Sequence, residues 1–250
     1  MCTLVLAWQV FDDAPIAAAA NRDERVDRPS RPPATIDDDP RVVAPTDEEA
    51  GGTWIGYNDA GVFVAITNRR RDPETGAGFE PDRSRGLLVR DALAAESHHE
   101  AVSTVRDELA ARPYDGFNLV VADAGDATLL EWDGVLRATH FDPGVHVVVN
   151  DGYEGATETA DRVREAVRPV PRGDPTGDAD RGEEVSAWFE TAAAALEDHD
   201  LGACVHGEGY ATRSSSLISI DATGAGRYRF ADGPPCETDY EDVEIGDGQF

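Results

Sequence analysis

The sequence predicts an α+β fold in which antiparallel sheets are covered by helices. Its segments follow in the order strands, two helices, strands, two helices, strands, without the regular strand–helix alternation of a parallel sheet. The apolar runs that read as strands are short and are bounded by turn residues, as in hairpins. A chain of 250 residues can bury a sizeable core, and we expect residues 1–250 to form a single domain.

The chain begins with a predicted hairpin. Thr3–Trp8 is a continuous apolar run, which is typical of a buried strand. After a turn rich in Asp and Pro, a second strand begins at Ile16 and turns abruptly polar at Asn21–Glu24. Pairing of the two strands would bring this polar end beside the start of the chain. We expect Arg25–Pro45, which is rich in Pro and Asp, to form a surface loop.

A second hairpin and a pair of helices come next. Gly51–Tyr57 and Val62–Asn68 flank the sequence Asn-Asp-Ala-Gly, whose residues tolerate positive φ. Leucines recur with helical spacing from Ser84, and a second helix follows that Pro113 closes.

The second half of the chain repeats this succession of strands and helices. The predicted strands are Phe117–Ala122, Thr128–Trp132, Val145–Asn150, Ser214–Asp221 and Arg227–Phe230, and the predicted helices are Ala160–Val167 and Val185–Leu196. We expect Pro169–Gly182 to be a polar loop and the acidic residues 233–250 to form a frayed tail.

The charge balance is extreme, with 50 acidic residues against 22 basic ones and a net charge of −28. Every basic residue is Arg and none is Lys. This composition predicts a surface adapted to concentrated salt, where a Debye length of about 3 Å shortens charge repulsion. A cationic partner is the alternative explanation. Nucleic-acid binding is excluded, because no basic patch stands out against this acidic field.

The three cysteines are an odd number at irregular spacing, which does not indicate a disulfide framework or a zinc site. The sequence therefore predicts no metal and no cofactor. It contains no stretch of about 18 apolar residues and no basic, apolar leader. We expect a cytoplasmic protein without a membrane span; nothing in the sequence specifies an oligomeric state.

Cys2 directly follows the initiator methionine, and Cys is small enough for that methionine to be removed. Removal would place a thiol and a free α-amine on one residue. The amine, with an ordinary pKa of about 8, could then act as the base for a thiol with an ordinary pKa of about 8.5. The alternative is a cysteine that only fills a buried strand.

Polar residues at predicted strand ends could complete a site around this thiol. Asp23 could orient the amine, and the amide of Asn68 or Asn150 could donate to an oxyanion, a contact typically worth about 3–4 kcal/mol. Arg213, just before the strand at Ser214–Asp221, could lower the pKa of the thiol or bind a substrate carboxylate. The alternatives are turn asparagines and a structural ion-pair arginine. His206, two residues after Cys204, has either a structural role or a place in the site.

A family resemblance rests on short motifs in a fixed order. They are Met1-Cys2-Thr3, Asn21-Arg22-Asp23-Glu24, Gly51-Gly52-Thr53-Trp54-Ile55-Gly56 with Thr67-Asn68-Arg69, Val149-Asn150, and Thr212-Arg213-Ser214-Ser215. Together they resemble the NRDE family, also called the transport and Golgi organisation protein 2 family, over most of the chain from Cys2 to about Asp221.

The resemblance implies a four-layer αββα sandwich of the N-terminal nucleophile hydrolase type. Choloylglycine hydrolase and penicillin acylase-like enzymes of that type cleave non-peptide amides through an N-terminal Cys. Carried over by motif, Cys2 matches their nucleophile and Asp23 their Asp. Asn150 matches the Asn of their oxyanion hole, and Arg213 matches a late Arg.

The sequence departs from those enzymes at one position, and further polar residues are candidates for substrate contacts. We assign substrate binding to Asn21, Arg22, Asn68 and His206. The early Arg of the enzymes does not carry over, because Ala20 stands in its place and Arg22 is expected on the other face of the strand.

Three functional hypotheses follow. The first is an N-terminal-cysteine amidohydrolase that cleaves a small acyl amide. The second is a non-catalytic protein that binds or carries a hydrophobic ligand, such as haem or an acyl-CoA-like lipid, because eukaryotic members of the family are linked to haem and lipid handling. The third is a fold retained with neither activity.

Overall fold

A computed structural model describes residues 2–69, 81–169 and 181–245 of the chain. In this part of the chain, two seven-stranded sheets pack between two pairs of helices. The expectation for Pro169–Gly182 falls almost entirely outside the described residues.

The first sheet is antiparallel and has the strand order β11-β10-β1-β2-β12-β13-β14. Its strands are β1 (Thr3–Trp8), β2 (Ile16–Arg25), β10 (Gly144–Val149), β11 (Gly152–Tyr153), β12 (Tyr210–Ile220), β13 (Gly226–Ala231) and β14 (Glu241–Asp242). The predicted N-terminal hairpin is confirmed, because β1 pairs with β2 from Thr3 opposite Asn21 to Trp8 opposite Ile16.

The second sheet is also antiparallel, and its strands follow one another in chain order from β3 to β9. They are β3 (Ser30–Asp38), β4 (Arg41–Asp47), β5 (Ile55–Asn58), β6 (Phe63–Asn68), β7 (Phe117–Ala122), β8 (Ala127–Trp132) and β9 (Leu136–His140). The predicted hairpin of residues 51–68 is present as β5 and β6.

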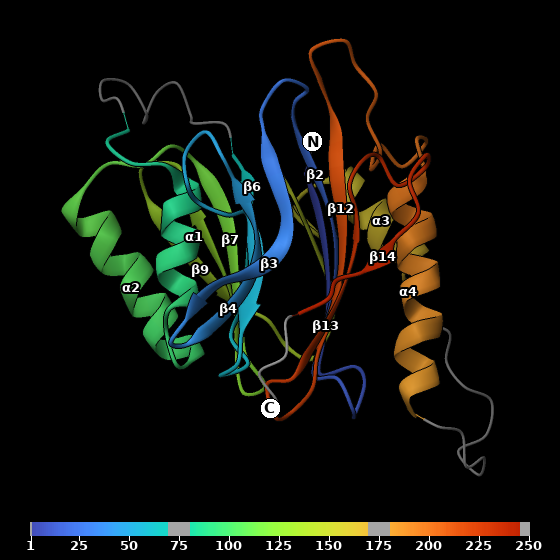
Figure 1. Cartoon of the computed structure of the whole chain (residues 1–250), viewed down its shortest axis with the longest axis horizontal. Coiled ribbons are helices and arrows are strands. Elements are labelled where there is room, and N and C mark those ends of the chain that lie inside the picture. Colours follow the sequence, from blue (N-terminus) through green and yellow to red (C-terminus); the bar gives the residue numbers. More distant parts are fainter. Residues whose placement is uncertain (1, 70–80, 170–180, 246–250) are drawn as a thin grey trace.

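The helices form the outer layers of a four-layer αββα sandwich, as predicted. Helices α1 (Arg85–Leu93) and α2 (His98–Ala111) cover the second sheet, and α3 (Glu158–Ala166) and α4 (Arg181–Glu197) cover the first (Figure 1). No helix among the described residues is long and apolar enough to cross a membrane.

The two sheets meet face to face through a shared apolar core. Alternate residues of β1, including Leu4, Leu6 and Trp8, pack against Phe63 and Leu129 of the second sheet. Side chains alternate between the two faces of a strand, so the odd-numbered residues of β1 point to the helices instead. This alternation decides which side chains near the start of β1 lie between the sheets.

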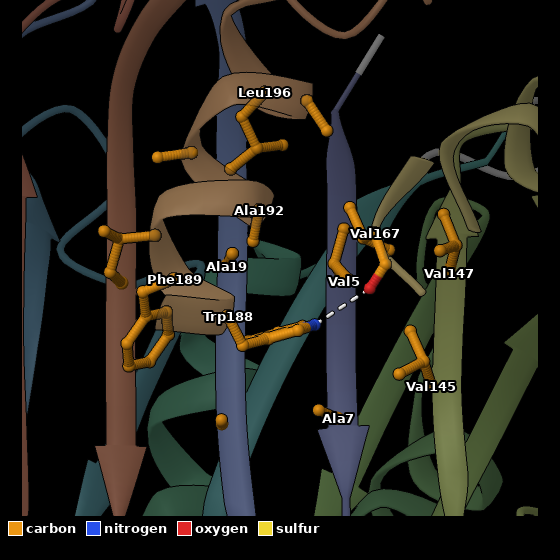
Figure 2. Close-up of a cluster of buried hydrophobic side chains, with 14 of the residues drawn as sticks. Val5, Ala7, Ala19, Val145, Val147, Val167, Trp188, Phe189, Ala192 and Leu196 are labelled. Carbon is orange, nitrogen blue, oxygen red and sulfur yellow. Dashed lines mark hydrogen bonds between the residues drawn. The ribbon is translucent and has the colours of Figure 1, made fainter. Parts of the chain in front are cut away.

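Helix α4 is anchored on the first sheet by its aromatic residues (Figure 2). Trp188 packs among Val5, Ala7 and Ala19, and its Nε1 donates a hydrogen bond of 2.9 Å to the carbonyl oxygen of Val167. Full burial of one such side chain stabilises the fold by roughly 1.5–3 kcal/mol. Helix α4 packs against β2, and its C-terminal end lies at Asn21, among the polar residues that end this strand.

The expected surface loop at Arg25–Pro45 is wrong, because β3 and β4 form a hairpin there. Val42, Val43 and Ala44 of β4 are buried in the two cores of the second sheet. Two of the prolines that suggested a loop, Pro32 and Pro33, lie in β3, which is the edge strand of its sheet, where a missing backbone donor is tolerated.

Two further expectations differ from the structure near the C-terminus. Strand β12 begins at Tyr210, four residues earlier than predicted, so that Arg213 lies inside the strand. The acidic segment expected to fray from residue 233 is ordered at least to residue 245. It contributes β14, and the hydroxyl of Tyr240 lies 2.6 Å from Ser215 Oγ.

Candidate functional site

A pocket of about 80 Å³ lies at the start of β1. Residues from both sheets and from the N-terminal end of α1 line it: Cys2, Arg22, Asp23, Glu24, Arg28, Asp47, Thr53, Trp54, Ile66, Asn68, Ser84, Arg85 and Gly86. Of the eight residues predicted to form a site, Cys2, Arg22, Asp23 and Asn68 therefore share one pocket.

The Cys2 thiol is buried against the backbone of the neighbouring strand. The backbone N–H of Asp23 points at Cys2 Sγ at 3.4 Å, and Sγ lies 3.5 Å from the Asp23 carbonyl oxygen. Burial and the negative charge of Asp23 raise the pKa of Cys2 to about 11, while Arg22 opposes this shift. With the chain intact before it, the thiol is therefore protonated at neutral pH.

The strand registers place further polar side chains in a row with Cys2. Extending the β1–β2 and β1–β10 pairings by one residue puts Cys2 opposite Arg22 on one side and Asn150 on the other. Arg22 is in turn opposite Ser214 of β12. Opposed residues of an antiparallel sheet point to the same face, which here is the face between the two sheets.

This row contains buried polar atoms with unused hydrogen-bonding capacity. Arg22 Nη1, Asn150 Oδ1 and Ser214 Oγ have no hydrogen-bond partner among the groups of the described residues. Buried polar atoms are nearly always paired, so three in one row around a thiol are unusual for a purely structural region.

Arg22 lies on the pocket side of β2, so its expected position on the other strand face is wrong. Its guanidinium carbon lies 4.1 Å from the centre of the Trp54 ring, and its Nη2 is 4.0 Å from a Glu24 carboxylate oxygen. Burial lowers the pKa of Arg22, but an arginine remains charged at neutral pH. It is the arginine whose charge favours the Cys2 thiolate.

Asp23 is buried and held by its neighbours on β12. Its Oδ1 accepts a hydrogen bond of 2.6 Å from Thr212 Oγ1, and its carbonyl oxygen accepts one of 2.7 Å from the Tyr210 hydroxyl. Burial raises the pKa of the Asp23 carboxyl, and the Thr212 bond counteracts that shift. The hydroxyl of Thr212 also accepts from the backbone N–H of Val205 at 2.9 Å.

Asn21 is not among the residues that line the pocket. Its Nδ2 donates hydrogen bonds of 2.8 Å to the carbonyl oxygens of Leu196 and Ala203. Asn21 thus joins β2 to the end of α4, where helix carbonyls lack partners within the helix. Asn21 therefore anchors β2 to α4 and does not contact the pocket.

Arg213 and His206 are also not among the residues that line the pocket. Arg213 is the extra residue of a β-bulge between Thr212 and Ser214, where the register of β12 against β2 shifts. His206 lies beside Cys204 and Cys236 instead, with its Nε2 3.1 Å from Cys236 Sγ.

Asn118 is a residue of this region that sequence reasoning missed. Its Nδ2 donates to the backbone carbonyls of Val149 at 2.8 Å and Asn150 at 3.2 Å, and so ties β7 to the end of β10. Its Oδ1 accepts from Arg69 at 3.0 Å. The available signal was a lone amide inside the apolar strand Phe117–Ala122. Asn118 thereby fixes the backbone of the residue opposite Cys2.

The floor of the pocket depends on a contact between two glycines. The Thr53 N–H donates to the Gly86 carbonyl at 3.0 Å, and a Cβ on Gly52 would lie 2.2 Å from the Gly86 carbonyl carbon. Only glycine at position 52 allows the Gly51–Gly56 motif to touch the first turn of α1. Arg85 of that turn is held by its own hydrogen bond of 2.7 Å to the Gly116 carbonyl.

A larger cavity of about 490 Å³ lies between α4 and the strands β12 to β14. Its lining includes Phe189, Arg227, Arg229 and Asp242, and none of the cysteines. The cavity beside Cys2 is smaller, but it brings together the thiol and the charged residues predicted to act on it.

Two solved structures share this fold. Penicillin V acylase from Agrobacterium tumefaciens superposes with a TM-score of 0.53 and 15% identity, over 92% of this chain and 83% of that chain. A Caenorhabditis elegans N-acylethanolamine-hydrolyzing acid amidase ortholog superposes with a TM-score of 0.54 and 11% identity, over 90% of this chain and 94% of that chain. At this identity the likeness establishes the αββα fold of N-terminal nucleophile hydrolases.

Curated relatives carry one family name. The Transport and Golgi organization 2 homolog of Mus musculus is 34% identical over 128 residues, which cover 45% of this chain and only 43% of that protein. The Bos taurus homolog is 27% identical over 255 aligned residues, covering 86% of this chain and 87% of that protein. A model of the family described as Transport and Golgi organisation 2 matches residues 1–232, which is most of the chain. The chain therefore belongs to the Transport and Golgi organisation 2 family.

Proposed function

We propose that this protein is an N-terminal-cysteine amidohydrolase that cleaves a small acyl amide once the peptide bond before Cys2 has been cut. The observation that carries the proposal is the pocket at the start of β1, where the Cys2 thiol lies with Asp23 and Arg22. The fold supports it, because the names of two proteins that share the fold describe an acylase and an amidase.

The reaction needs a base for the thiol, and the free α-amine of Cys2 would supply it. The amine takes the thiol proton while Sγ bonds to the substrate carbonyl carbon, and the same proton then passes to the leaving nitrogen as the C–N bond breaks. A water molecule next attacks the resulting thioester, which releases the carboxylic acid and restores the thiol. Atoms and protons balance without a metal or a redox partner.

The neighbouring charges suit this cycle. Once the α-amine of Cys2 has taken the thiol proton, the resulting α-ammonium would lie beside the buried Asp23 carboxylate and would stabilise the thiolate, whereas the thiol of the uncut chain has a pKa of about 11. Arg22 would favour the thiolate in the same way. Asn68 lines the pocket, and Asn150 is opposite Cys2 in the sheet, so either amide is suitably located to donate to an oxyanion.

The size of the pocket limits the substrate. Its volume of about 80 Å³ admits a carbonyl group and a few adjoining atoms. Pockets for drug-sized ligands usually measure about 300–1,000 Å³, so the alternative of a haem or acyl-lipid carrier at this pocket is disfavoured. An amide that presents its carbonyl to Cys2 and leaves its acyl chain outside fits better.

A substrate panel tests the proposal. The processed protein is assayed with penicillin V and a series of N-acylethanolamines, and release of the amine or acid is followed. We expect turnover of at least one amide by the wild type, and a loss of at least about 1,000-fold in Cys2→Ala. An equal rate in Cys2→Ala, or no turnover by protein shown to begin with Cys2, contradicts the assignment.

A further inference from the structure

A second cluster of reactive side chains lies beside the C-terminal segment. His199 follows α4, Cys204 and His206 lie in the connection from α4 to β12, and Cys236 lies between β13 and β14. One ligand atom from each of the four residues falls within 4.8 Å of all the others. The mechanism proposed above uses none of them.

The spacing of these atoms is close to that of a tetrahedral metal site. The Sγ atoms of Cys204 and Cys236 are 3.4 Å apart, and His206 Nε2 lies 3.1 Å from Cys236 Sγ and 3.7 Å from Cys204 Sγ. Around a tetrahedral ion with metal–sulfur bonds of about 2.3 Å and metal–nitrogen bonds of about 2.0–2.1 Å, ligand atoms lie about 3.3–3.8 Å apart. A disulfide would need the two sulfur atoms about 2.0 Å apart.

The surroundings of the cluster also suit a metal. His199 Nδ1 lies 3.2 Å from the Cys204 carbonyl oxygen, and an N–H donated there leaves Nε2 with its lone pair for a cation. Cys204 is buried, whereas His199 and His206 are exposed, so an ion can enter from solvent.

We propose that His199, Cys204, His206 and Cys236 bind one zinc-class divalent cation in tetrahedral geometry. Two thiolates and two imidazoles are a donor set that selects Zn²⁺ over the Mg²⁺ and Ca²⁺ that carboxylates bind. The expectation of no metal rested on irregular cysteine spacing. The structure brings the cysteines together from segments 32 residues apart, which spacing alone does not reveal.

The bound cation would be structural and would fasten the C-terminal segment to the connection that supports the pocket. Val205, between two of the ligands, donates to Thr212 Oγ1, and this hydroxyl donates to the Asp23 carboxylate.

Cobalt titration of the reduced, chelator-treated protein tests the site, in the presence of excess Mg²⁺ to occupy surface carboxylates. We expect a thiolate-to-cobalt charge-transfer band that saturates at one Co²⁺ per chain and disappears on addition of equimolar Zn²⁺. Cys204→Ser and Cys236→Ser should each weaken binding more than about 100-fold, beyond the 10–100-fold typical of outer-shell changes. Cys2→Ser is the matched control, because it removes the third thiol and should retain the band.

Three results would overturn the site. They are a reduced wild type with no cobalt–thiolate band, a band that persists in the Cys204→Ser/Cys236→Ser double variant, and a Cys204–Cys236 disulfide in protein that binds no metal. The wild-type titration needs no variant to fold, so the first result stands on its own.

Discussion

Cys2 is held in a chemical state that depends on what precedes it in the chain. Its thiol is buried beside the negative charge of Asp23, and both features raise its pKa to about 11. At pH 8 only about one thiol in 1,000 would then be ionised. A free α-ammonium on Cys2 would lower the pKa of the thiol. Removal of Met1 would therefore make the thiol more reactive.

Arg22 is the residue whose replacement tests the electrostatics of the thiol. Its positive charge lowers the pKa of Cys2, so we expect Arg22→Gln to shift the pH midpoint of Cys2 alkylation upward. Peptide mass spectrometry follows alkylation at Cys2 alone. Arg25→Gln is the control, because Arg25 is an exposed arginine at the end of the same strand. An unchanged midpoint in Arg22→Gln would show that Arg22 does not influence the pKa of Cys2.

Residue-level roles could be predicted only where a motif gave the type of side chain. Cys2, Asp23 and Asn68 were predicted and do line one pocket. The sequence could not show which of the two arginines, Arg22 or Arg213, lies beside the Cys2 thiol. A β-bulge shifts the register at Arg213, and the pairing of β2 with β12 brings Arg22 to the inter-sheet face.

Among the elements, helix α1 contributes its first turn to the lining of the pocket. Its first turn is capped by Ser84, whose side chain accepts from the Gly86 N–H, and it reaches the pocket only because Gly52 and Gly86 touch. The Gly51–Gly56 motif therefore acts on the site through packing at Gly52, and also through Thr53 and Trp54, which line the pocket.

Gly52→Ala tests that packing. The new Cβ would meet backbone atoms of Gly86, so we expect a loss of about 1–3 kcal/mol in the free energy of unfolding and a distorted pocket. Chemical denaturation measures the loss. Gly209→Ala is the control, because a Cβ there meets nothing within 4 Å and should change stability by less than about 0.5 kcal/mol. Equal stability of the two variants would contradict the packing argument.

Elements with a clear apolar period were predicted from sequence, and edge elements were not. The hairpins at β1–β2 and β5–β6 and the positions of α1 and α2 follow from local patterns. The β3–β4 hairpin was missed because β3 is an exposed edge strand containing prolines. The conformation of this hairpin depends on tertiary contacts, and no local sequence pattern reveals them.

For the whole molecule, the net charge of −28 predicts stability that depends on salt. Screening shortens the Debye length from about 10 Å at 0.1 M salt to about 3 Å at 1 M, which weakens repulsion among the acidic groups. We expect the melting temperature to rise by several degrees over this range of KCl. KCl is preferred to sulfate, which strengthens apolar burial by itself. A melting temperature independent of KCl would refute the predicted salt adaptation.

The layered architecture was the most predictable property of the whole molecule, because the order of strands and helices constrains it. Long-range juxtapositions were the least predictable. The cluster of His199, Cys204, His206 and Cys236 and the bridge made by Asn118 join segments that the sequence separates widely.

The central claim is that Cys2 acts as an N-terminal nucleophile, and intact-mass analysis combined with an electrophilic acyl probe tests it most directly. We predict a mass that begins at Cys2 and one acyl adduct per chain on Cys2 at neutral pH, absent in Cys2→Ala. Protein that retains Met1 should label far more slowly, because burial keeps its thiol protonated. A chain isolated only with Met1 in place, or a processed chain whose Cys2 takes no label, would contradict the claim.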